Sequence, residues 1–229
     1  MIVGNGLIAN AFKNENINFQ DCIVFASGVS NSRVNDEKET QRELDLIRKC
    51  LDLNKKFIYF STSSIFDNTA KESIYIKHKL LVEEFIRLNF KDYIIYRLPI
   101  VVGKSKNPHT LTNYIFNTIK QDDVIPIYIY ACSYMIDVED VVKYVNKTKK
   151  LNKVAINLNF NNKIFIEELV SIFEKILNRK VKKEILEEGE CYTLDNSLFI
   201  ENISKDDLMC LSQNYNYELI KKYYGGGNE

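Results

Sequence analysis

Four short apolar runs set narrow limits on the fold of this chain. They are rich in β-branched and aromatic residues and nearly unbroken by polar ones, a pattern typical of parallel strands covered on both faces. The runs are "MIV" at residues 1–3, "CIVFAS" at 22–27, "KFIYFST" at 56–62 and "DYIIYRLPIVVG" at 92–103. Helical stretches separate the later runs, and this alternation predicts a doubly wound α/β fold.

Two amphipathic stretches supply helices between these strands. The predicted buried stripes are Leu44, Ile47 and Leu51 within residues 35–53, and Ile76, Leu80 and Ile86 within residues 73–90. Apolar residues at helical spacing mark the face that a helix turns toward a sheet. We therefore expect both stretches to cover the sheet.

The alternation becomes less regular from about residue 104. Short strand-like runs such as "IPIYIYA" mix with helical ones such as "TLTNYIFNTIKQ". We expect a first part at residues 1–103 and a smaller mixed α/β lobe at residues 104–229, packed over the carboxyl ends of the strands. Residues 153–160, "KVAINLNF", are expected to form the final strand of the sheet. Ligands bind at the carboxyl edge in folds of this class.

A glycine-rich turn follows the first strand. The segment "VGNGLIANAF" contains G-x-G-x-x-A between a strand and a helix. Gly4 and Gly6 allow a sharp turn and a close approach to a pyrophosphate, while the helix N-terminus offers unpaired N–H groups. Ala9 is small enough for close packing of helix on strand. The alternative interpretation is a tight strand–helix turn without a ligand.

A tyrosine and a lysine four residues apart, Tyr75 and Lys79, lie in the second helical stretch. A phenol has a pKa near 10 and is a weak base at neutral pH, but a nearby ammonium on the same helix face favours its ionised form. Thr62, with Ser63 as second choice, ends the third strand and offers a hydroxyl to orient a substrate oxygen. The alternative is an exposed pair on a helix surface, which is our interpretation of Tyr217 and Lys221.

Charge and cysteine content exclude several classes of protein. Lys and Arg number 31, as do Asp and Glu, so the chain has no net field for nucleic acid or anionic membrane. The five cysteines are scattered and form no C-x-x-C, which predicts free thiols in a reducing compartment, with no disulfide framework and no metal site. The sequence has no apolar run of membrane-spanning length and no signal peptide, and we expect a cytoplasmic protein.

Five stretches together resemble the extended short-chain dehydrogenase/reductases, the group of nucleotide-sugar epimerases, dehydratases and reductases. They are "GNGLIA", "DCIVFASG", "FIYFSTSSIFD", "YIKHK", and "YRLPIVVGKS" with "MIDVEDVVKYV". The likeness spans most of residues 1–170, and the context of Thr62 is most similar to the dehydrorhamnose-reductase branch. It implies a reduced Rossmann-like sheet, in which residues 1–103 are the cofactor-binding part and 104–229 the substrate-binding lobe.

The resemblance also implies roles for individual residues. Tyr75 would be the acid/base, Lys79 would lower the tyrosine pKa and hold the nicotinamide ribose, and Thr62 would hydrogen-bond the reacting oxygen. Contacts to NAD or NADP would come from Gly4, Asn5, Gly6, Leu7, Ile8, Ala26, Ser27, Lys79, Pro99 and Ile100. Substrate contacts would come from Ser63, Lys104 and His109, with Lys106 nearby, and no metal is implied.

The sequence departs from the family pattern in three places. Val3 stands where the family has its first glycine, and Cys132 and Ser133 replace a basic residue that often contacts a substrate diphosphate. The larger departure is that two strands and a helix are missing between residues 14 and 22. Their loss removes the residue that binds the adenosine ribose of the cofactor. It also leaves the first strand at an exposed sheet edge. Arg33 is a speculative substitute for a phosphate contact.

The sequence as a whole favours an enzyme that reduces or epimerises a 4-keto sugar, with a nucleotide-linked sugar of surface-glycan synthesis as substrate. Ser63 and Ser64 replace the acidic pair of the family dehydratases, which argues against dehydration. The alternative is a non-catalytic binding or partner protein that kept the fold and lost the cofactor. By analogy with the family, residues 35–53 and 73–90 would form a homodimer interface.

Overall fold

The structure, a computed structural model, describes residues 1–15, 17–29, 37–204, 207 and 214–226. Its centre is a parallel sheet of five strands in the order β1-β2-β3-β4-β9. The strands are β1 (Ile2–Val3), β2 (Cys22–Phe25), β3 (Lys56–Thr62), β4 (Tyr93–Leu98) and β9 (Val154–Asn157). The predicted α/β fold with a doubly wound parallel sheet is confirmed, and β9 lies within the run 153–160.

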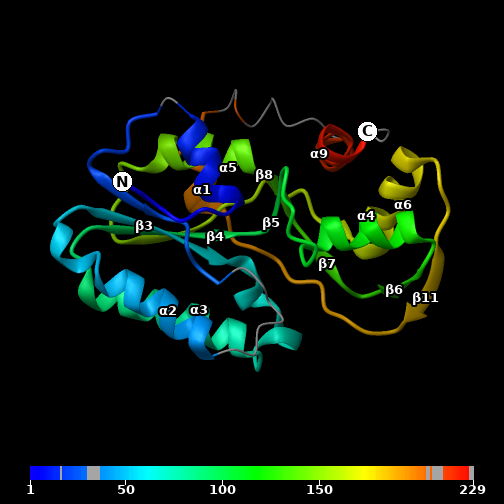
Figure 1. The fold of residues 1–229 in the computed structure, drawn as a ribbon, viewed down its shortest axis with the longest axis horizontal. Helices are drawn as coiled ribbons and strands as arrows, with labels where there is room; N and C mark the ends of the chain where they lie inside the picture. Colours follow the sequence, from blue (N-terminus) through cyan, green and yellow to red (C-terminus); the bar gives the residue numbers. More distant parts are fainter. Residues whose placement is uncertain (16, 30–36, 205–206, 208–213, 227–229) are drawn as a thin grey trace.

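Helices cover both faces of this sheet, as Figure 1 shows. One face carries α1 (Leu7–Asn14), α5 (Val138–Thr148) and the short α7 (Ser197–Ile200), and the other carries α2 (Glu37–Arg48) and α3 (Ile74–Asn89). Each face has its own hydrophobic cluster, with Val24, Ile58 and Ile94 on the α1/α5 side and Ile23, Phe57 and Ile95 on the α2/α3 side. Alternate residues of each strand therefore point into different layers.

In the described part of the chain, the lobe beside the sheet is built from three two-stranded pairings and three helices. The strand pairs are β5 (Ile100–Val102) with β8 (Met135–Asp137), β7 (Cys132–Ser133) with β10 (Ile164–Phe165), and β6 (Val124–Tyr128) with β11 (Lys182–Leu186). The helices are α4 (Leu111–Gln121), α6 (Ile166–Leu177) and α9 (Tyr215–Tyr224). They share a separate hydrophobic cluster that includes Ile115 and Phe173. The division of the chain at residue 103 stays a prediction. Three elements that follow this residue lie with the main sheet: β9 is one of its strands, and α5 and α7 cover one of its faces.

Two local expectations are wrong. The run 92–103 is not one strand: it splits at Pro99, which has no N–H to donate, and β5 leaves the sheet to pair with β8. Leu80 is not in the buried stripe of α3, because 45% of it is exposed. Lys79 takes the buried position instead, together with Ile76 and Ile86.

The main sheet ends at β1, as the missing unit predicts. Among the described residues β1 pairs with β2 alone, through Ile2 opposite Val24 and Val3 opposite Phe25. The amino-terminal ammonium of Met1 donates to the carbonyls of Phe19 and Cys22, which ties this edge to the chain that leads into β2. The exposed edge is therefore only two residues long, and short edges limit unwanted strand pairing.

Candidate functional site

Parallel strands in register bring the predicted site residues to one edge of the sheet. Val3 lies opposite Phe25, Phe25 opposite Tyr59, and Thr62 opposite Leu98. The residues that follow these strand ends therefore lie along the carboxyl edge. They are Gly4, Asn5 and Gly6 after β1, Ala26 and Ser27 after β2, Ser63 after Thr62 in β3, and Pro99 and Ile100 after β4.

The glycine turn has the geometry that a close ligand approach requires. Gly4 has φ +127°, and a Cβ on it would lie 2.2 Å from the carbonyl oxygen of Ala26, so a larger residue does not fit. Gly6 caps α1 without a side-chain hydrogen bond, and a Cβ on it would meet nothing within 4 Å. The space at the Cβ position of Gly6 is thus open, and no side chain caps the first N–H groups of α1 through Gly6.

Side chains next to the turn are already engaged by the protein. Lys13 Nζ donates to Gly4 O at 2.8 Å and to Asn5 Oδ1 at 2.9 Å. Leu7 packs so closely on Gly103 that a Cβ there would lie 2.8 Å from its Cδ1. Ile8 packs against the core. A ligand at this turn would therefore meet the backbone of Leu7 and Ile8, not their side chains.

Thr62 begins the short 3-10 helix η2 (Ser63–Phe66) at the end of β3. Its Oγ1 accepts a hydrogen bond from Ser64 N at 3.1 Å, and the residue is 8% exposed. A hydroxyl that accepts in this way still carries a hydrogen to donate. Ser63 is buried, with its Oγ 3.4 Å from the hydroxyl of Tyr192. The helix η2 packs against α3.

Tyr75 and Lys79 lie one turn apart on α3, with Lys79 Nζ 5.9 Å from the centroid of the Tyr75 ring. Tyr75 is half-buried, whereas Lys79 is 2% exposed. Lys79 Nζ donates to Tyr59 Oη at 2.9 Å and to Glu43 Oε1 at 3.2 Å. The predicted pair is therefore close, and its ammonium is held by two further groups that sequence reasoning missed.

Glu43 could have been found from the pattern of α2. It lies four residues before Ile47 and seven before Cys50, and all three side chains are buried. Burial alone would raise the pKa of Glu43, but the Lys79 ammonium and hydrogen bonds from His78, Val29 N and Tyr59 outweigh it and lower the pKa to about 2. A carboxylate on the apolar stripe of a helix requires a buried cation, and Lys79 is that cation.

The second Tyr–Lys spacing does not form such a pair. Tyr217 lies on α9, and its ring has Lys175 Nζ of α6 at 4.8 Å from the centroid. Lys221, four residues after Tyr217 on the same helix, is exposed.

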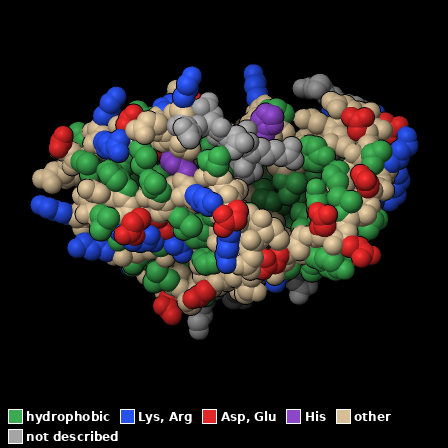
Figure 2. All heavy atoms as spheres, turned by 90° about the horizontal axis from the view of Figure 1, so that it is seen from below, with side chains coloured by type: hydrophobic (Ala, Val, Ile, Leu, Met, Phe, Trp, Pro, Cys, Tyr) green, Lys and Arg blue, Asp and Glu red, His purple; other side chains and the backbone are tan. Residues whose placement is uncertain are grey.

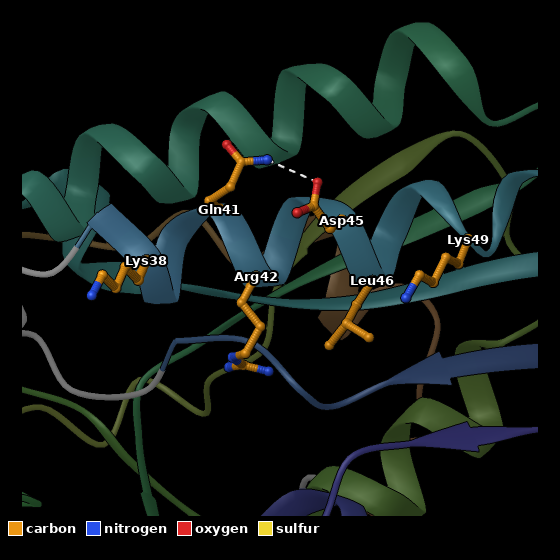
Figure 3. A pocket seen from close by; sticks show the side chains of 6 residues that line it. All are labelled: Lys38, Gln41, Arg42, Asp45, Leu46 and Lys49. Atoms are coloured by element: carbon orange, nitrogen blue, oxygen red, sulfur yellow. Dashed lines mark hydrogen bonds between the residues drawn. The ribbon is translucent and has the colours of Figure 1, made fainter.

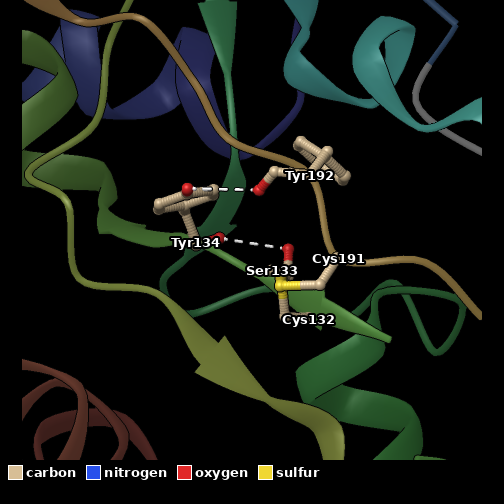
Figure 4. The surroundings of a disulfide bond; sticks show 5 residues. All are labelled: Cys132, Ser133, Tyr134, Cys191 and Tyr192. Atoms are coloured by element: carbon tan, nitrogen blue, oxygen red, sulfur yellow. Dashed lines mark hydrogen bonds between the residues drawn. A yellow bond between two sulfur atoms is a disulfide. The ribbon is translucent and has the colours of Figure 1, made fainter. Parts of the chain in front are cut away.

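A strap formed by residues 187–196 crosses from β11 to β9 past the end of β3. A disulfide between Cys132 of β7 and Cys191 of the strap ties it to the lobe (Figure 4). Tyr134 Oη donates to Tyr192 O at 3.3 Å, and Glu190 accepts hydrogen bonds from Asn68 N and Asn68 Nδ2. The strap thus brings Tyr192 against Ser63.

The disulfide corrects the expectation that the cysteines are free. Cys132 and Cys191 are 59 positions apart in the sequence, and only the packing of the strap on β7 makes them neighbours. Cys22 and Cys50 are free and buried, as expected, and Cys210 lies outside the described residues. The inference of a reducing compartment rested on free thiols, so the disulfide removes that support. A cytoplasmic location stays a prediction.

The flank of α2 next to the sheet edge is polar. A groove there is lined by Lys38, Gln41, Arg42, Asp45, Leu46 and Lys49. Figure 3 shows Gln41 hydrogen-bonded to Asp45, with Arg42 and Leu46 pointing the opposite way. Arg42 donates to Ser27 Oγ and Ser27 O, both at 3.3 Å, and so braces the turn after β2. Arg33 lies outside the described residues.

The suggested substrate residues after β5 lie around a separate cleft. Lys104 and Lys106 line it together with Tyr223 and Tyr224 of α9. His109 is exposed, and its backbone N donates to Asn107 Oδ1. Contact of these residues with a substrate stays a prediction.

The surface between the main sheet and the lobe is hollowed. Figure 2 shows this hollow with hydrophobic side chains on its floor and charged side chains around its rim. Apolar concave surfaces with a few polar groups are typical of small-molecule sites. Within the described ranges, no cluster of three or more His, Cys, Asp or Glu residues could hold a metal ion. The same ranges contain no helix long and apolar enough to cross a membrane.

Comparison with known proteins shows the fold. No protein-family model and no curated protein sequence matches the chain. Among solved structures, UDP-glucuronic acid 4-epimerase from Bacillus cereus is 19% identical, with a TM-score of 0.67 over 96% of this chain and 80% of that one. UDP-glucose 4-epimerase from Thermus thermophilus is 12% identical, with a TM-score of 0.71 over 96% and 82%. ADP-L-glycero-D-manno-heptose-6-epimerase from Helicobacter pylori is 17% identical, with a TM-score of 0.69 over 89% and 71%.

These similarities show that the chain has the fold of these nucleotide-sugar epimerases. The Bacillus structure holds UDP-glucuronic acid and NAD, and the Thermus structure holds NAD. Because the sequence identities are below 20%, the similarity shows the fold alone and does not show the reaction.

Proposed function

We propose that the protein is an NAD(P)-dependent oxidoreductase or epimerase whose substrate is a nucleotide-linked 4-keto sugar or its alcohol. The proposal rests on the open space at Gly6, at the same sheet edge as Thr62, together with the close pair of Tyr75 and Lys79 on α3. Structures of the same fold hold NAD and UDP-sugars, which supports this assignment.

The turn after β1 fits the pyrophosphate of a dinucleotide. Gly4 keeps the backbone close to Ala26, and Gly6 leaves the α1 N-terminus uncovered. The positive end of the α1 dipole and the Lys13 ammonium both favour an anion at this place. When bound, the nicotinamide would give or accept a hydride.

The remaining chemistry falls to side chains of this chain. Thr62 would donate its hydroxyl hydrogen to the reacting sugar oxygen, and the phenol of Tyr75 would give or take the proton of that oxygen. Lys79 would place a positive charge beside the phenol, 5.9 Å from the centroid of its ring. The strap residue Tyr192 would limit access from the side of Ser63.

Replacement of Gly6 by valine tests the turn itself. A side chain there enters open space, so the fold should persist with a cost of about 1 kcal/mol at the helix cap. NADH or NADPH affinity, measured by fluorescence titration, should fall about tenfold or more, because the valine occupies the place of the pyrophosphate. Gly226→Val is the matched control, since Gly226 also faces open space.

The alternative is a binding or partner protein that has lost the cofactor. The observation in its favour is the missing unit, which leaves β1 at the sheet edge and one side of the adenosine site without strands. The same titration separates the two: absence of NADH and NADPH binding at millimolar concentration would favour the alternative.

A homodimer is also part of the proposal. Ile74, Leu81 and Leu88 are spaced by seven residues on α3 and are 42%, 53% and 75% exposed. A stripe of this kind is typical of a helix that packs on another helix. It supports association through α2 and α3, in line with the family analogy.

A further inference from the structure

A buried polar cluster centred on Glu43 joins four segments of the chain. Its Oε1 accepts hydrogen bonds from Tyr59 Oη at 2.7 Å and Lys79 Nζ at 3.2 Å. Its Oε2 accepts from Val29 N at 2.7 Å and is 2.9 Å from His78 Nε2. One carboxylate on α2 therefore contacts β3, α3 and the chain that follows β2.

The charges in this cluster depend on each other. Glu43 is 0% exposed and Lys79 is 2% exposed, so neither is hydrated as a free ion would be. A buried charge without a partner is strongly unfavourable, whereas a hydrogen-bonded pair is tolerated. Without the carboxylate, the Lys79 ammonium would be a buried charge without its ionic partner, which favours its turning toward solvent.

Gly28 closes the cluster from the side of the β2 loop. A Cβ on Gly28 would lie 2.7 Å from Lys79 Nζ and 2.9 Å from Glu43 Oε1, so only glycine lets the backbone lie this close to the pair. Gly28 directly follows Ser27 at the carboxyl edge of the sheet. The backbone, the carboxylate and Tyr59 together surround the ammonium and leave it little freedom to move.

We infer that Glu43, assisted by Tyr59, is a positioning residue that holds the Lys79 ammonium in place for the cofactor and for Tyr75. This inference rests on the proposed function for the role of Lys79. An ammonium carries three N–H donors, and Glu43 and Tyr59 take two of them. One donor therefore remains for the ribose or the phenol, in a direction that the other two fix.

The test compares Glu43→Gln with Glu83→Gln. Glu83 is equally buried and lies one turn after Lys79 on α3, but its hydrogen bonds in the described part of the chain go to Arg97 and Arg87 and not to Lys79. Labelling with trinitrobenzenesulfonate, followed by peptide mass spectrometry, measures how accessible the Lys79 amine is. We expect Lys79 to be protected in the wild type and in Glu83→Gln, and labelled about tenfold or more faster in Glu43→Gln.

A second readout is the dissociation constant for NADH. Glu43→Gln should weaken NADH binding about tenfold, which corresponds to one hydrogen bond from a charged group, and Glu83→Gln should not. If the wild type binds no NADH, the proposed function fails, and the labelling still decides whether Glu43 positions Lys79. Equal labelling of Lys79 in the two variants would overturn the inference, as would equal NADH affinity where the wild type binds.

Tyr59→Phe keeps the test decisive if Glu43→Gln does not fold. It removes one partner of Lys79 without removing a charge. We then expect Lys79 labelling a few-fold faster than in the wild type, on the order of the loss of one buried hydrogen bond. Unchanged labelling in Tyr59→Phe would overturn the inference in that case.

Discussion

Turnover should fall about 100- to 10,000-fold when Tyr75 is replaced by phenylalanine, the range that loss of a general acid or base produces. The substitution removes one hydroxyl from a half-buried ring and keeps the ring itself, so α3 and its contacts should persist. Because the hydroxyl acts only on the reacting oxygen, the affinity for NADH should stay close to that of the wild type.

The measurement is oxidation of NADH or NADPH with a panel of nucleotide-linked 4-keto sugars. Tyr217→Phe is the matched control, because Tyr217 has the same spacing to a lysine but lies on α9. Equal turnover in Tyr75→Phe and the wild type would remove Tyr75 from the mechanism. A tenfold loss of turnover in Tyr217→Phe would show that removal of a phenol outside the site also lowers turnover.

Loss of the Cys132–Cys191 disulfide should have the second large effect. The bond closes a loop between residues 59 positions apart, and constraint of the unfolded chain by a loop of that size contributes about 4 kcal/mol in the chain-entropy model. In Cys191→Ser the midpoint of urea unfolding should fall accordingly. The strap should also open more often, because only noncovalent contacts, such as the hydrogen bonds of Tyr192 and Glu190, would then hold it.

Limited proteolysis reports on the strap separately from global unfolding. Cleavage within residues 187–196 should be faster in Cys191→Ser and in the reduced wild type than in the oxidised wild type. Cys132→Ser, Cys191→Ser and the double variant should lose the same stability, since each breaks the same bond. If the oxidised and reduced wild type, once denatured, titrate the same number of thiols, the bond is absent and the prediction fails.

Much of the architecture could be predicted because it depends on local patterns. The apolar runs at β2, β3 and β4 are nearly unbroken by polar residues, and the glycine turn after β1 has a recognisable sequence motif. The exposed edge at β1 was predicted because the sequence lacks the two strands and the helix that the family has between residues 14 and 22. The split of the run 92–103 could also have been predicted, because Pro99 has no N–H to donate within a sheet.

The parts that escaped prediction are contacts between distant segments. Glu43 and Lys79 are 36 positions apart on different helices, and Cys132 and Cys191 meet only because the strap crosses the lobe. Leu80 was expected in the buried stripe of its helix because it is hydrophobic, but Lys79 takes the buried position. The buried carboxylate reverses this order, because the pair satisfies a charge that apolar packing cannot.

The central claim is that a nicotinamide dinucleotide binds over the amino-terminal glycine turn and points toward Thr62 and Tyr75. A crystal structure of the protein with NAD tests this most directly. We predict density for the pyrophosphate in front of Gly4 and Gly6, and for the nicotinamide ring between Thr62 and Tyr75. Cofactor density at another place on the molecule, or none at saturating NAD, would contradict the account.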